Sequence, residues 1–110
     1  MELAIGFPRA GTFLSEGSFA TVLDLKDLRC FIAVYETRGF GRAAKTLNTV
    51  QSNISVRIRR LEDEVGAPLF DRLHRSIRPT AKGEVLYRYA VKVLQDISEM
   101  EAAIIEQRVA

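Results

Sequence analysis

The sequence predicts a mostly α-helical fold, a winged helix-turn-helix followed by a long dimerisation helix. Three observations lead to this prediction. Apolar residues recur every three or four positions along three successive stretches between residues 24 and 65, which is typical of amphipathic helices. A short apolar stretch with a polar, basic centre follows, as in a β-hairpin. From residue 80 to residue 110 no proline and a single glycine interrupt a fourth helical pattern.

The composition indicates one small globular domain. Apolar residues make up 47% and charged residues 27% of the 110 residues, which argues against disorder. No apolar run approaches the roughly 20 residues of a membrane-spanning helix, so we expect a cytoplasmic protein without membrane contact. The single cysteine, Cys30, is expected to be a buried, inert thiol. With one histidine and no inward pair of carboxylates, we expect no enzyme activity, no cofactor and no metal.

Positive charge is concentrated in the middle of the chain. Residues 26–78 carry eleven basic and six acidic side chains, a net charge of +5, whereas residues 1–25 and 79–110 carry −2 and −1. The formal net charge of the whole chain is therefore only +2. An anionic partner is expected to bind the middle region.

The N-terminal half is expected to begin with a flexible leader over residues 1–23, which contain three glycines, a proline and no periodicity. A first helix should begin after Asp24 as N-cap and end at Gly39 as the first residue beyond the helix. We expect one stripe of this helix to be buried, made of Leu25, Leu28, Phe31, Ile32 and Tyr35.

A second, short helix is expected over residues 40–47, with its two alanines facing inward and Asn48 in a left-handed turn. Thr49 should cap a third helix that ends before Gly66. Two short helices joined by a tight turn, the second of them basic, have the layout of a helix-turn-helix. The buried stripe of the third helix should be Ile54, Ile58, Leu61 and Val65.

The C-terminal half is expected to contain a wing at about residues 70–79 and a last helix capped by Thr80. Apolar residues step through the last helix by four and three positions, the pattern of a coiled-coil seam. We expect this seam to join two copies of the chain; the alternative is that the helix packs on its own domain. The seam residues are Leu86, Ala90, Val93, Ile97, Met100 and Ile104.

The outer face of the third helix is suited to DNA. Its N-terminal half carries hydrogen-bonding side chains, and its acidic residues lie at the far end. The N-terminal half is therefore the part expected to enter a major groove, and a helix N-terminus also favours phosphate. The outward residues are Ser52, Val56 and Arg59, flanked by Asn53, Ser55 and Arg60.

Residues of many chemical types between about residues 25 and 84 match the pattern of one family without a gap. They are Leu28 to Val34, Phe40, Arg42, Ala43, Ala44, Leu47, Gln51, Ser55, Ile58, Leu61, Glu62, Gly66, Pro68, Leu69, Phe70, Arg72, Arg75, Thr80 and Gly83. In these residues the chain resembles the LysR-type transcriptional regulators. The resemblance implies that the third helix reads the major groove, that the wing contacts the minor groove or backbone, and that the last helix pairs with a second subunit.

By position, Gln51 and Ser55 resemble the family's base-contacting residues, and Arg75 resembles its wing arginine. We expect sequence-specific binding of double-stranded DNA by a homodimer that regulates transcription. The expected base contacts are Gln51, Ser52, Ser55 and Val56. The expected backbone contacts are Arg42, Lys45, Asn53, Arg59 and Arg60, and the wing contacts are Arg72, Arg75 and Arg78.

The chain departs from the family pattern around the expected reading helix. Val50 stands where serine is common before Gln51, and Val56 stands where arginine is common. An outward valine can contact the methyl group of thymine, so we expect a base preference that differs from the average of the family. Pro79 replaces a common leucine and removes a backbone donor at the base of the wing.

The domain boundaries are expected to be 1–23 for the leader, 24–79 for the winged helix-turn-helix and 80–110 for the linker helix. An effector-sensing domain of the family is expected to be missing from this chain, and a small-molecule effector is expected only for that domain. We expect a fragment rather than a natural short protein. The competing class is an interaction module, in which the last helix recruits a partner protein and the winged domain is a scaffold.

Overall fold

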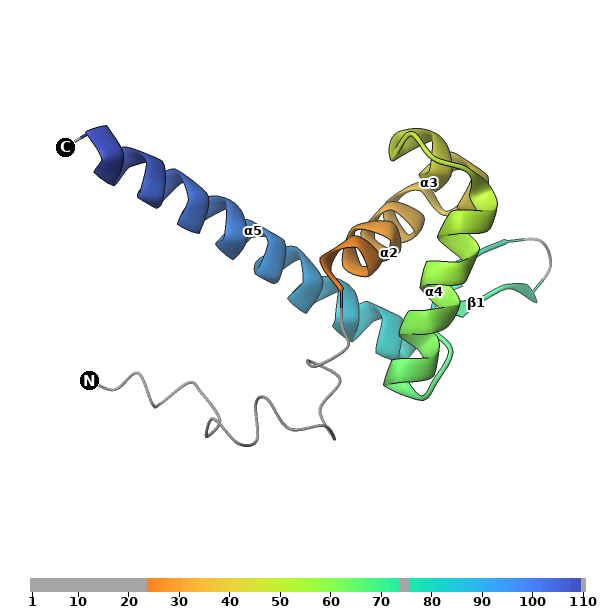
Figure 1. Cartoon of the computed structure of the whole chain (residues 1–110). Helices are drawn as coiled ribbons and strands as arrows, with labels where there is room; N and C mark the ends of the chain where they lie inside the picture. Colours follow the sequence, from red (N-terminus) through yellow and green to blue (C-terminus); the bar gives the residue numbers. More distant parts are fainter. Residues whose placement is uncertain (1–23, 74–75, 110) are drawn as a thin grey trace.

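The computed structural model describes residues 24–73 and 76–109 (Figure 1). Helices α2, α3 and α4 pack against one another, a two-stranded hairpin lies beside α4, and α5 extends away from the domain as a long arm (Figure 1). The predicted winged helix-turn-helix with a long last helix is thus confirmed; the expected leader lies outside the described residues. The elements are α2 (Leu25–Thr37), α3 (Phe40–Thr46), α4 (Gln51–Val65), β1 (Phe70–Asp71), β2 (Arg78–Pro79) and α5 (Ala81–Val109).

The core forms where α2, α3, α4 and the start of α5 meet. The predicted stripe of α4 is buried at Ile54, Ile58 and Leu61, and Val65 is half-buried. The predicted stripe of α2 is only partly right, because Leu25 is 40% exposed. Helix α2 contacts three other helices, so its buried face is broader than one stripe. The residues of α2 that are buried are Asp27, Leu28, Cys30, Phe31, Ala33 and Val34.

Helix α2 begins as predicted and ends differently. The Asp24 side chain accepts a hydrogen bond from the Lys26 amide at 2.8 Å, so Asp24 is the N-cap. The residue with left-handed backbone after the helix is Arg38, with φ 58°, and not Gly39. Gly39 is instead extended and precedes α3, so the predicted helix end was wrong by one residue.

Gly39 lies beside the Arg42 side chain, which packs against the end of α2. The Arg42 guanidinium folds back onto the end of α2, donating from Nε to the Thr37 carbonyl at 2.8 Å and from Nη2 to the Arg38 carbonyl at 2.7 Å. A Cβ at position 39 would lie 2.9 Å from this guanidinium. Arg42 thereby satisfies carbonyls that the helix end leaves without partners.

The turn between α3 and α4 has the predicted left-handed Asn48, with φ 60°. The predicted capping residue of α4, Thr49, was wrong: the N-cap is Val50, which has no side chain able to cap. Thr49 stands one residue too early, and its hydroxyl accepts from Asn53 Nδ2 at 3.1 Å. Gly66 ends α4 with φ 81°, as predicted.

The wing and the start of α5 are joined closely. Strands β1 and β2 pair antiparallel, with Phe70 opposite Pro79. The Thr80 hydroxyl accepts from the Gly83 amide at 3.1 Å and so caps α5 as predicted. At Gly83 the helix crosses the Leu69 carbonyl so closely that a Cβ would lie less than 3.0 Å from its oxygen. Across residues 24–73 and 76–109, no helix combines the length and apolar character that crossing a membrane requires.

Candidate nucleic-acid interface

A hollow of about 360 Å³ separates the start of α4 from the wing. We call it the α4–wing hollow; its lining residues are Phe40, Gln51, Ser55, Arg72, Ser76 and Ile77. The structure therefore brings together three residues predicted for the site, Gln51 and Ser55 from α4 and Arg72 from the wing. Sequence reasoning missed Ser76 and Ile77, since their position depends on how the hairpin folds back over α4, which no local pattern reports.

The outer face of α4 is open to solvent. Gln51, Ser52 and Asn53 are exposed, Val56 is 57% exposed, and Ser55 is half-buried at the edge of the hollow. The outward orientation predicted for Ser52 and Val56 is confirmed. Sequence reasoning treated the neighbouring valine only as a lost cap, but Val50 is 63% exposed and widens the apolar surface beside the hydrogen-bonding groups.

The N-terminus of α4 is favourable for an anion. Its first turn has neither a side-chain cap nor an acidic residue. The first amide groups of a helix have no partner inside the helix, and the helix dipole adds partial positive charge there. A phosphate group placed at this end would meet donors without displacing a capping side chain.

A buried carboxylate on α2 holds two arginines of α4. Asp27 is only 3% exposed, and it accepts from Arg57 Nη1 at 2.8 Å and from Arg60 Nη2 at 3.1 Å. Asp24 lies 3.7 Å from Arg60 and 3.8 Å from Arg57. The hydrogen bond to Asp27 raises the pKa of Arg57. Arg60, predicted to contact the DNA backbone, is thus directed toward α2. No local pattern indicates that Asp27 is buried.

The other predicted cations differ in how freely they can reach a partner. Arg72 lies 4.9 Å from the centre of the Phe40 ring and 3.7 Å from a carboxylate oxygen of Glu62, so it lies along the protein surface. Lys45, Arg59 and Arg78 are exposed. Arg75 lies outside the described residues.

The apolar stripe of α5 divides into two parts. Ala90 is 1% exposed and belongs to the core of its own domain, and Leu86 packs against that core. The structure thus corrects the predicted seam at Ala90, which has no surface left for a second copy, because α5 lies on α2 there. Further along α5, Val93, Met100 and Ile104 are 41%, 54% and 56% exposed.

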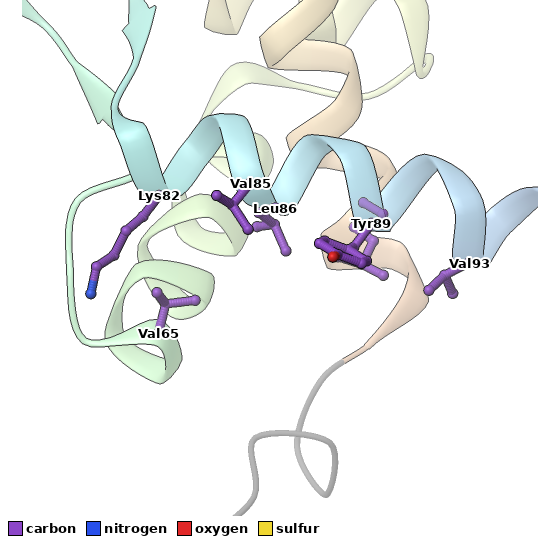
Figure 2. Close-up of a pocket in the computed structure, with 8 residues that line it drawn as sticks. Val65, Lys82, Val85, Leu86, Tyr89 and Val93 are labelled. Atoms are coloured by element: carbon purple, nitrogen blue, oxygen red, sulfur yellow. The ribbon is translucent and has the colours of Figure 1, made fainter. Parts of the chain in front are cut away.

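A groove of about 420 Å³ runs along α5 beside this junction (Figure 2). Figure 2 shows Val85, Leu86, Tyr89 and Val93 following one side of α5, with Val65 of α4 across from them. We call this the α5 groove, and its wall is almost wholly apolar. The lining residues are Leu28, Val65, Lys82, Val85, Leu86, Tyr89, Ala90 and Val93.

The chemistry of the remaining polar groups is simple. Cys30 is buried as predicted, and burial raises the pKa of its thiol. Within the part of the chain that the structure describes, no three His, Cys, Asp or Glu side chains are grouped so as to hold a metal ion.

Residues 25–84 match the family model described as bacterial regulatory helix-turn-helix protein, lysR family. Among curated relatives, the HTH-type transcriptional regulator CzcR of Bacillus thuringiensis is 38% identical over 86 residues, which are 78% of this chain and 29% of CzcR. The HTH-type transcriptional regulator BudR of Klebsiella aerogenes is 49% identical over 72 residues, 66% of this chain and 50% of BudR. The chain thus spans half or less of the length of these two relatives.

Solved structures agree with the sequence matches. A crystal structure of the BenM DBD in complex with catB site 1 DNA has a TM-score of 0.77 and 33% sequence identity, covering 80% of this chain and 99% of that one. A crystal structure of a CbnR DBD–DNA complex has a TM-score of 0.74 and 29% identity, covering 77% of this chain and 98% of that one.

Proposed function

Because the chain belongs to the LysR family of bacterial regulatory helix-turn-helix proteins, we propose that it binds double-stranded DNA sequence-specifically, as a homodimer that regulates transcription. Helix α4 enters the major groove, and the wing contacts the minor groove or backbone. The observation that carries this proposal is the convergence of Gln51, Ser55 and Arg72 on one hollow beside the uncapped N-terminus of α4. The similar BenM and CbnR domains are each in a complex with DNA.

The base-contacting residues in this proposal are Gln51, Ser52, Ser55 and Val56. The Gln51 amide can donate to and accept from adenine at once, which gives discrimination between bases. Ser52 and Ser55 supply adaptable hydroxyl groups, and Val56 supplies an apolar contact to a thymine methyl. The exposure of Val50 beside Gln51 extends this apolar contact toward the turn.

The residues proposed to contact the DNA backbone differ in whether their side chains are already bonded to α2. Lys45 and Arg59, both exposed, and Arg78 on the wing are the strongest phosphate contacts in the proposal. Arg42 and Arg60 contact the backbone only through the part of the guanidinium that their bonds to α2 leave available. Asn53 contributes beside the N-terminus of α4, and Arg72 and Arg75 contribute from the wing.

The proposed dimer forms through α5. Toward the end of α5, residues 98–107 are all exposed, and a short helix without tertiary contacts is only marginally stable in water. A second copy would cover Met100 and Ile104 and fill the apolar α5 groove. Val93 and Ile97 join this seam, and Leu86 borders it from the core side.

In this proposal the two functions follow the predicted domain boundaries: residues 24–79 bind DNA, and residues 80–110 link two copies. The relatives are transcriptional regulators, and we propose that this chain likewise acts without catalysis and in the cytoplasm.

The reading role of Gln51 is tested by DNA binding. Gln51→Ala should weaken binding to a duplex selected from random DNA by about 1–3 kcal/mol, and it should bind random duplex as well as the wild-type chain does. Gln95→Ala on α5 is the matched control and should change neither. Equal loss on selected and random DNA would assign Gln51 to positioning only, and absence of binding to any duplex at low salt would favour the interaction module.

The dimer is tested by light scattering at tens of micromolar. Met100→Glu with Ile104→Glu should convert a dimer into a monomer, because two charges would be buried in an apolar seam. Ser98→Glu, on another side of α5, is the control and should remain dimeric. A monomeric wild-type chain would refute pairing through α5.

A further inference from the structure

A reciprocal contact joins α2 to the beginning of α5. The rings of Tyr35 on α2 and Tyr87 on α5 stack with centroids 3.7 Å apart and an interplanar angle of 5°. The Tyr35 hydroxyl donates to Glu84 Oε1 on α5 at 2.7 Å. The Tyr87 hydroxyl donates to Glu36 Oε2 on α2 at 2.6 Å. Each helix thus provides one tyrosine and one glutamate, and we call these four residues the tyrosine clamp.

The other contacts of α5 with the domain fix its distance more than its direction. Gly83 and Ala90 bring the helix close to Leu69 and to the core because neither has a large side chain. The flank of α5 beside the α5 groove is left to the second copy in the proposed dimer, so contacts within one domain do not set the direction of α5 on that flank (Figure 2). The tyrosine clamp holds a different flank, since Tyr87 follows Leu86 by one residue, or about 100° around the helix.

The length of α5 magnifies any change at its base. Helix α5 has 29 residues, and Ile104 lies about 26 Å beyond Tyr87 along the helix axis. A change of about 10° in direction at the clamp would move Ile104 by about 4.5 Å. This displacement exceeds the ~3.4 Å that separates successive base pairs. In a symmetric dimer both arms would shift, and the separation of the two reading helices would shift with them.

We infer that the tyrosine clamp sets the direction of α5 and thereby the half-site spacing that the dimer accepts. The inference rests on the proposed function, because only a DNA-binding dimer has such a spacing. The four residues are positioning residues: they act through α5 and lie on the α2–α5 contact, apart from the α4–wing hollow.

The electrostatics of the clamp agree with this role. The hydrogen bond to Glu84 raises the pKa of Tyr35, and the hydrogen bond to Glu36 raises the pKa of Tyr87 to about 12. Both phenols therefore remain protonated donors at neutral pH. The Arg38 guanidinium, 5.0 Å from the centre of the Tyr35 ring, adds a further contact from the end of α2.

The test compares DNA duplexes that differ only in spacing. Two half-sites obtained by selection from random DNA are separated by the selected spacing, or by one or two base pairs more or less, and a single half-site serves as reference. We expect the wild-type chain to prefer one spacing about tenfold. Tyr35→Phe with Tyr87→Phe, which removes both hydrogen bonds, should reduce that preference to about twofold and leave single half-site binding unchanged.

Two controls separate positioning from general stability. Glu36→Gln with Glu84→Gln keeps hydrogen-bond acceptors and should retain the wild-type preference. Ser98→Ala, which removes a hydroxyl from α5 outside both the clamp and the seam, should also leave the preference unchanged. An unaltered spacing profile in the double phenylalanine variant would overturn the inference, as would an equal loss at every spacing and on the single half-site. Failure of the wild-type chain to bind any duplex would overturn the proposed function instead.

Discussion

Replacing Gly83 with alanine sets two opposing effects against each other. Alanine is favoured over glycine inside a helix by about 1 kcal/mol, so propensity alone predicts a more stable protein. The added Cβ, however, would lie within 3.0 Å of the Leu69 carbonyl oxygen, 3.2 Å from its carbon and 3.3 Å from Pro79 Cβ. Relieving overpacking of this kind typically costs about 1–3 kcal/mol.

The same carbonyl adds a second cost. Leu69 O accepts a hydrogen bond from the Thr80 amide at 2.9 Å, and moving it away from position 83 would weaken that bond, which is worth about 1 kcal/mol. The two costs together outweigh the propensity gain. We expect Gly83→Ala to lower the free energy of unfolding by about 2 kcal/mol, which corresponds to a fall in melting temperature of about 8–16 °C for a domain of this size.

Gly41→Ala provides the matched control. Gly41 is also in the first turn of a helix, but a Cβ there would meet only Gln51 Oε1, at an ordinary 3.4 Å. This variant should be stabilised by up to about 1 kcal/mol. Both are measured by thermal and denaturant unfolding followed by circular dichroism, at one protein concentration because dimerisation alters apparent stability. If Gly83→Ala were stabilised as much as Gly41→Ala, the close crossing of α5 over the wing would be refuted.

Three further predictions address charge. Asp27→Ala should lower the free energy of unfolding by about 2–3 kcal/mol, less than the loss of a fully buried pair, because Arg57 and Arg60 remain 21% and 51% exposed. The exposed control Asp63→Ala should cost under about 0.5 kcal/mol, and equal losses would contradict a structural role for the Asp27 ion pairs. Arg59→Ala should reduce the slope of log affinity for DNA against log salt concentration by about one unit. Arg60→Ala should reduce this slope less, and equal reductions would show that the bond of Arg60 to Asp27 does not withhold it from DNA. The pKa of Tyr87 is raised from 10.0 to about 12 in the folded chain. The neutral phenol therefore adds to the free energy of unfolding below pH 10, and this contribution is lost as the pH rises through about 12. Denaturant unfolding across this range should show a smaller loss in Tyr87→Phe, and an identical loss would exclude Tyr87 as its source.

Much of the fold could be predicted because each element carries its own signal. Periodic apolar residues revealed the helices, and Asp24, Asn48 and Gly66 marked boundaries where a cap or a left-handed backbone is needed. The errors arose where a distant contact decides. Gly39 resembled a helix end, but the left-handed residue is Arg38. The Arg38 carbonyl accepts from Arg42, and a single sequence does not reveal that this side chain folds backward.

The site could be predicted less completely than the fold. Exposure followed from helical periodicity, so the outward positions of Ser52 and Val56 were predictable. The contribution of Ser76 and Ile77 to the α4–wing hollow required the hairpin to be built. The stripe of α5 likewise continued through Ala90 in the sequence, and only packing against α2 shows that Ala90 is used within its own domain.

The distribution of charge shows most clearly why composition alone misleads. The net charge of +5 over residues 26–78 treats every arginine as available to DNA. In the folded chain, Arg57 and Arg60 bind Asp27, and Arg42 binds two carbonyls. These bonds connect α2 with α3 and α4, so they hold the helix-turn-helix together. The basic residues of the region thus stabilise the helix-turn-helix as well as supplying positive charge, and in the proposed function base discrimination comes from uncharged side chains such as Gln51 and Ser55.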